Sequence, residues 1–242
     1  MPLSRLELLP TELVQKVFLL STNLSLPFTS HHLHRHLADQ FLQLRVLSLA
    51  YSHPEALTDL LSRRFFTSHI LHTCESRHGP LDLTGALLPS RLLKPPFSLQ
   101  NLDLLDDLAS RGAALDAEDS EIPILALRDA IKLHCTRAIT FFIRTLAVKC
   151  SSNTVALAIR AGLPLSGPGG IAELLRAHGE QTGESVCLDA LIWWAALGRD
   201  PCMVSEKSGT GTGVNMQVLG YLLETSSPPG EVLGAVGESI GS

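Results

Sequence analysis

The residues of this sequence that come nearest to a chemical site are four histidines at 31, 32, 34 and 36. On a helix, His32 and His36 would share one face, as two zinc ligands do. A zinc ion needs further ligands, and no Cys pair or carboxylate stands nearby at ligand spacing. We therefore expect a solvated helix face and no metal site, with a pH-responsive surface as the alternative.

A second candidate is the glycine-rich run from Ser208 to Gly213. A phosphate-binding loop needs a preceding buried strand and a Gly-Lys-Ser/Thr or Gly-x-Gly-x-x-Gly pattern, and here Lys207 precedes the glycines. The run therefore predicts a flexible insertion. Five widely scattered cysteines without paired spacing indicate a reducing compartment, and no Gly-x-Ser-x-Gly turn is present. We expect no enzymatic activity and no cofactor.

Composition favours an all-α chain. Of the 242 residues, 45% are hydrophobic and 5% aromatic, and Leu and Ala recur at helical spacing. The formal net charge of −5 gives no field that would collect nucleic acid. No segment approaches the ~20 apolar residues that cross a bilayer. We expect a cytoplasmic or nuclear protein with neither nucleic acid nor membrane as a partner.

The first helix carries the clearest signal in the sequence. Pro10 suits the N1 position, and Glu12 would meet the positive end of the helix dipole. Apolar residues then recur at spacings of three to four, at Leu9, Leu13, Val17, Phe18 and Leu20. A continuous apolar stripe of this kind needs a partner surface.

This segment resembles an F-box, the three-helix module that docks F-box proteins onto the adaptor of SCF-type cullin–RING ubiquitin ligases. The matching residues are Leu9, Pro10, Glu12, Leu13, Val17 and Phe18, followed by Asn23-Leu24-Ser25-Leu26. Pro27 would open a second helix bearing Leu33 and Leu37, and Asp39 would cap a third. The chain is similar to a group of F-box-like proteins of filamentous fungi with degenerate helical repeats.

The resemblance implies a substrate-receptor subunit, monomeric outside the ligase complex, that binds the adaptor and an unknown client protein. The implied adaptor contacts are Leu9, Pro10, Leu13, Val17, Phe18, Leu24 and Leu26. The alternative is a ligase-independent interaction scaffold whose first helices only cap a helical array. Burial distinguishes these two alternatives, because helices that only cap the array would bury their apolar side chains within the chain itself.

The later sequence predicts helical hairpins of ankyrin-like length. Arg111, Arg144 and Arg176 follow apolar residues and stand 33 and 32 positions apart (144 − 111 and 176 − 144), near the ankyrin period. No Thr-Pro-Leu-His motif is present, and His134 stands where a Gly would separate paired helices. A generic array of helical hairpins therefore remains the alternative.

These patterns divide the chain into an F-box-like domain (1–52), a connecting helix from Pro54 with a Pro-rich linker (53–97), degenerate ankyrin-like repeats (98–225) and a flexible tail (226–242). The expected repeat helices end at Gly112, Gly162, Gly179 and Gly198, and Asn215 begins the last one. Of Trp193 and Trp194, at least one should be packed.

Overall fold

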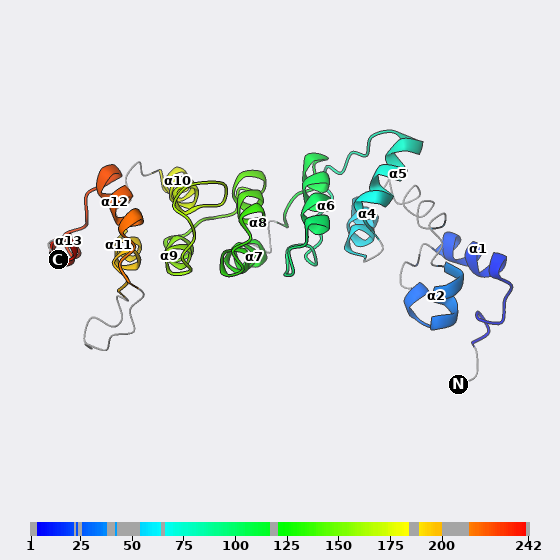
Figure 1. Ribbon diagram of the computed structural model, residues 1–242. Coiled ribbons are helices and arrows are strands. Elements are labelled where there is room, and N and C mark those ends of the chain that lie inside the picture. The colour runs from blue at the N-terminus through cyan, green and yellow to red at the C-terminus, as the bar shows by residue number, and fades with distance from the viewer. Residues whose placement is uncertain are drawn as a thin grey trace. The chain divides into compact units, whose positions relative to one another are not determined.

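The computed structural model describes residues 4–21, 23, 26–37, 42, 54–63, 66–116, 121–183, 189–199 and 213–240 (Figure 1). Helices make up its regular structure there, and the described residues contain no strand beyond one isolated parallel bridge between Leu87 and Ala114. The expected all-α class is confirmed. The chain forms two compact units, residues 1–91 with 103–116 and residues 92–102 with 117–242.

The first unit begins with α1 (Thr11–Ser21), the short 3-10 turn η1 (Leu26–Phe28) and α2 (His31–Leu37). The prolines lie slightly outside their predicted places. The carbonyl of Pro10 accepts from the amides of Leu13 and Val14, so Pro10 precedes the first helical residue. Pro27 lies in η1, and α2 begins after Ser30, whose hydroxyl accepts from the Leu33 amide at 3.2 Å. The helix predicted from Asp39 falls outside the described residues except Leu42.

The remainder of the first unit contains α4 (Pro54–Ser62), α5 (Ser68–His78) and the last two turns of α6 (Leu99–Ser110). The helix expected from Pro54 is present. The segment predicted as a Pro-rich linker is instead partly helical and packed. Its backbone bonds to the chain after α6, with 2.9 Å from Leu83 N to Arg111 O and 2.8 Å from Leu88 N to Ala114 O.

This loop packs because its leucines alternate with turn residues and so turn inward without a helix. The buried side chains are those of Leu81, Leu83, Ala86, Leu88, Leu92 and Leu93. The compact units divide after Arg91, and residues 103–116 return to the first unit. That arrangement differs from the predicted boundaries at 52 and 97.

Among its described residues, the second unit contains three helical hairpins. They are α7 (Glu121–Lys132) with α8 (Thr136–Thr140) and the π-helical turn η2 (Phe141–Thr145), α9 (Ser152–Arg160) with α10 (Ile171–Thr182), and α11 (Ala190–Ala196) with α12 (Met216–Thr225). The first helix of each hairpin contacts the first helix of the next, α7 on α9 and α9 on α11 (Figure 1). Each hairpin therefore buries its apolar face against a neighbour.

Two helix ends differ from the sequence prediction. Helix α10 continues through Gly179 and stops at Gly183, which is left-handed with φ +76°. Residues 226–242, predicted to be a flexible tail, contain α13 (Leu233–Ile240). Ala235 and Val236 of α13 and the preceding Val232 are buried, so this segment packs through small apolar side chains.

Other predicted features of the hairpins are present. Asn215 caps α12 by accepting from the Val218 amide at 3.2 Å, and Trp193 is fully buried. His134, which stands where a Gly was expected, has the left-handed φ of +52° that a Gly would adopt without strain. The chain thus makes the turn between α7 and α8 at a conformational cost.

The recurring arginines do not make equivalent contacts. Arg111 binds Glu75, which lies 36 residues earlier, whereas Arg144 binds Glu173, which lies 29 residues later. Similar spacing in sequence therefore does not give the same packing role in each hairpin.

Candidate protein-interaction surfaces

Helix α1 presents an apolar face to solvent. The exposed fractions are 37% for Leu9, 47% for Leu13, 38% for Val17 and 76% for Leu20. Leu13, Val17 and Leu20 lie four and three residues apart and so share one side of α1, and Leu9 lies just before the first residue of the helix, Thr11. We call these four residues the first-helix surface.

The opposite face of α1 is buried. Val14 is fully buried and Phe18 is 4% exposed. Phe18 was predicted among the adaptor contacts, but its side chain faces inward because position 18 lies one turn after Val14 rather than one turn after Leu13. The Phe18 side chain therefore belongs to the buried face of α1 and does not line the first-helix surface.

Helix α2 fixes which face of α1 is turned outward. Leu33 and Leu37 of α2 are buried, as the sequence predicted. Two polar contacts join the helices, a hydrogen bond of 2.9 Å between Thr11 Oγ1 and His36 Nδ1 and one of 3.2 Å from Gln15 Nε2 to the His36 carbonyl. Because Thr11 and Gln15 lie four residues apart, this second stripe of α1 is tied to α2 and the first-helix surface stays outside.

The other predicted adaptor contacts are distributed around this surface. Pro10 is exposed next to Leu9, and Leu26 is half-buried in η1. Leu24 lies outside the described residues. The structure thus brings Leu9, Pro10, Leu13 and Val17 together, and adds Leu20, which the predicted contact set omitted.

The histidine cluster takes part in packing. The rings of His32 and His36 meet edge to face with centroids 4.5 Å apart, and His36 also engages Thr11. Among the residues that the structure describes, no three His, Cys, Asp or Glu side chains are grouped to hold a metal ion.

The buried thiol of Cys150 in the second unit has low reactivity near neutral pH. Cys150 is 2% exposed, and loss of hydration raises its pKa to about 12. Its backbone is held by α10, with Gln181 Oε1 accepting from the Cys150 amide at 2.6 Å and His178 Nδ1 lying 2.9 Å from the Cys150 carbonyl. A thiol with so high a pKa is not a nucleophile near neutral pH.

An ionic cluster ties α5 to α6 in the first unit. Arg111 donates to Glu75 Oε2 at 2.8 Å and to Asp107 Oδ1 at 3.1 Å, while His72 Nε2 lies 3.3 Å from Asp107 Oδ2. The hydrogen bond from Arg111 is the main reason why the pKa of Glu75 falls to about 2, and burial opposes it. The pKa of Arg111 is raised, chiefly by the same bond.

This pair predicts a pH dependence of stability at acid pH. Because the pKa of Glu75 is lower in the folded chain than its ordinary value of about 4.5, the pair stabilises the fold above that value and ceases to do so as pH falls towards 2. We expect Glu75→Gln to cost about 1 kcal/mol at pH 7. In urea unfolding, that difference should shrink between pH 4.5 and pH 2.5. Glu180→Gln, at an exposed site, is the control, and a difference for Glu75→Gln that does not change with pH would contradict the assignment.

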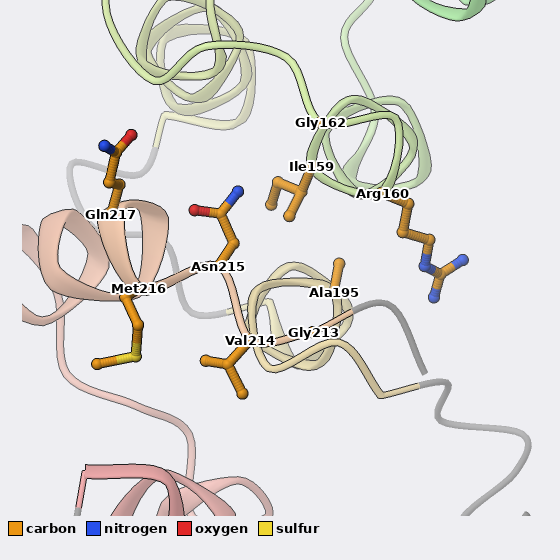
Figure 2. Close-up of a pocket in the computed structure, with 9 residues that line it drawn as sticks. All are labelled: Ile159, Arg160, Gly162, Ala195, Gly213, Val214, Asn215, Met216 and Gln217. Carbon is orange, nitrogen blue, oxygen red and sulfur yellow. The ribbon is translucent and has the colours of Figure 1, made fainter. Parts of the chain in front are cut away.

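A hollow of about 360 Å³ lies in the second unit, between the ends of α9 and α11 and the start of α12. Its lining residues are Ile159, Arg160, Gly162, Ala195, Gly213, Val214, Asn215, Met216 and Gln217. Figure 2 shows Ile159, Ala195 and Asn215 around the centre, with Arg160 on the α9 side and Met216 on the α12 side. We call these nine residues the α9–α12 pocket.

Sequence reasoning missed this pocket. Val214 and Met216 are exposed at 39% and 57%, although both are apolar and adjoin a helix start. The signal available in the sequence was the pair of apolar residues that flank the cap Asn215, since the cap itself does not need them. Only the stacking of α9 on α11 brings Ile159 and Ala195 beneath them.

Within the described part of the chain, no helix is both long and apolar enough to cross a membrane. Comparison with protein-family models, curated proteins and solved structures finds no match to this chain.

Proposed function

We propose that the chain is a substrate-receptor subunit of an SCF-type ubiquitin ligase, and that the first-helix surface binds the adaptor. One observation carries the proposal: Leu13, Val17 and Leu20 form an exposed apolar stripe on α1, a helix that is already packed on its other side, and the exposed Leu9 lies just before this helix. Exposed apolar patches of this kind are typical of protein-binding sites. A helix that presents apolar residues at i, i+4 and i+7 is a common recognition element.

In this role the chain performs no chemistry itself. The first unit would hold the adaptor, and the hairpins of the second unit would bind a client protein. Tethering the client near the ubiquitin-charged subunits replaces a bimolecular encounter with one at high effective concentration.

The second candidate is a ligase-independent interaction scaffold with ankyrin-like repeats. The contacts of α7 on α9 and α9 on α11 favour it, because stacked hairpins present extended binding surfaces without any adaptor. The exposure of Leu13 and Val17 counts against a purely capping role for α1, since a cap would bury them.

Capture by the purified adaptor tests the proposal. We expect Leu13→Asp and Val17→Asp each to weaken adaptor binding by at least about tenfold, because each puts a charge in the centre of an apolar contact. Binding is measured by pull-down and by biolayer interferometry on the full chain.

Leu125→Asp is the matched control, because Leu125 is a similarly exposed leucine (52%) on α7 in the other unit. Circular dichroism verifies that all three variants keep their helices. Failure of the natural chain to bind the adaptor, or binding by Leu13→Asp at natural strength, would overturn the proposal.

A further inference from the structure

Two charged residues border the apolar stripe of the first-helix surface on one side. Helix α1 contains one acid, Glu12, and one base, Lys16, and both side chains are exposed. Lys16 lies three residues after Leu13 and four before Leu20, so it stands beside both leucines on the helix surface. Glu12 lies one turn before Lys16 along the same edge. We call Glu12 and Lys16 the charged edge.

The opposite border of the stripe has no charged residue of α1. Ser21 lies there, four residues after Val17, and its hydroxyl donates to the Phe18 carbonyl at 3.2 Å. Next to it, Val14 and Phe18 are buried. A partner that covers the stripe therefore meets the charges of α1 on one side only.

Both groups of the charged edge are free to bind another molecule. Glu12 precedes Lys16 by four residues, which is the order that favours an ion pair within a helix. Among the residues that the structure describes, however, neither side chain makes an ion pair or a hydrogen bond. Glu7 differs, because its Oε2 already accepts from the Ser4 amide at 2.6 Å. The charged edge thus presents one anion and one cation that the fold itself does not use.

The order of the two charges makes the edge selective. Their sum is zero, so the edge does not attract a uniformly charged molecule such as a membrane surface or nucleic acid. It attracts a partner that places a cation opposite Glu12 and a carboxylate opposite Lys16. A partner lying in the reverse direction would bring like charges together, and that alignment is disfavoured.

We propose that the charged edge sets the direction in which the adaptor lies along α1. The adaptor covers Leu13, Val17 and Leu20 with an apolar surface, which is bordered by a carboxylate facing Lys16 and a basic group facing Glu12. This inference rests on the proposed function and adds to it the charge pattern of the partner. Charges at the border of an apolar contact act mainly on the association rate and on specificity, whereas the apolar residues supply most of the affinity.

Exchange of the two charges is the sharpest test. The double variant Glu12→Lys with Lys16→Glu keeps the net charge, the composition and the spacing, and reverses only the order. Rates of association and dissociation between the full chain and the purified adaptor are measured by biolayer interferometry at about 50 mM and about 500 mM NaCl. We expect association to slow by at least about fivefold at the lower salt concentration and by less than about twofold at the higher one, with a smaller change in dissociation.

Two further variants isolate the cause. Asp129→Lys with Lys132→Asp exchanges an exposed ion pair on α7 in the other compact unit, and both rates should stay unchanged. Lys16→Gln removes the cation alone and leaves Glu12 in the first turn of α1, where it meets the helix dipole. We expect this variant to slow association by about twofold at the lower salt concentration. Circular dichroism verifies that every variant keeps its helices.

The outcome is separable from that of the proposed function. A natural association rate in the charge-exchanged variant, or equal slowing at both salt concentrations, would overturn the inference. If Leu13→Asp still weakened adaptor capture in that case, the proposed function would stand without the charged edge. Failure of the natural chain to bind the adaptor would remove both.

Discussion

Gly169→Ala should destabilise the chain by at least about 3 kcal/mol. Gly169 lies in the loop between α9 and α10, is buried, and has a φ of +68°. A Cβ at this position would stand 2.5 Å from the carbonyl oxygen of Thr136, which is backbone and cannot rotate away. The substitution therefore combines left-handed strain with a clash between two hairpins.

The effect should reach beyond the loop. The Gly169 amide donates to Glu173 Oε2 at 2.7 Å, and the same buried carboxylate binds Arg144. Moving Gly169 away from Thr136 disturbs that link between the first two hairpins. Urea unfolding followed by far-ultraviolet circular dichroism measures the loss.

Gly183→Ala is the matched control for Gly169→Ala. Gly183 has a similar φ of +76° and no atom within 4 Å of its Cβ position, so it isolates the backbone strain. We expect it to cost about 1 kcal/mol. Equal losses in the two variants would show that Thr136 does not constrain Gly169.

Trp193→Ala should cost about 4 kcal/mol, the second large effect. Trp193 is fully buried on α11, the helix that packs on α9 and carries Ala195 in the floor of the α9–α12 pocket. Removing the indole leaves a cavity at this contact that the two helices cannot fill without moving. Thermal and urea unfolding give the size of the loss.

Trp194→Ala tests whether the position or the residue type matters. Trp194 is half-buried, and we expect its loss to cost roughly half as much, because less of its surface is removed from water. The sequence has two tryptophans, so each variant reports the fluorescence of the other. Emission from Trp193 should be the more blue-shifted of the two. A smaller loss for Trp193→Ala than for Trp194→Ala would contradict this packing.

The fold could be predicted from the sequence where local chemistry decides it. Apolar residues at spacings of three and four specified α1 and α4, Asn215 specified the start of α12, and glycines specified several helix ends. The prediction of a helix end at Gly179 was wrong because a glycine ends a helix only if the following chain turns away, and here α10 continues to Thr182 while Gln181 bonds to the backbone of Val148 and Cys150. Residues 81–93 were predicted to be part of a linker because the backbone partners of Leu83 and Leu88, which are Arg111 and Ala114, are distant in sequence.

The candidate surfaces divide in the same way. By itself, the sequence determined that α1 is amphipathic and that Leu13 and Val17 share a stripe, because helical periodicity is a local property. Tertiary structure alone decided that Phe18 turns inward while Leu13 stays outside, since the orientation of α1 is set by its contacts with α2. It alone formed the α9–α12 pocket, because Ile159, Ala195 and Met216 meet only where α9, α11 and α12 pack, and packing joins residues that no sequence spacing relates.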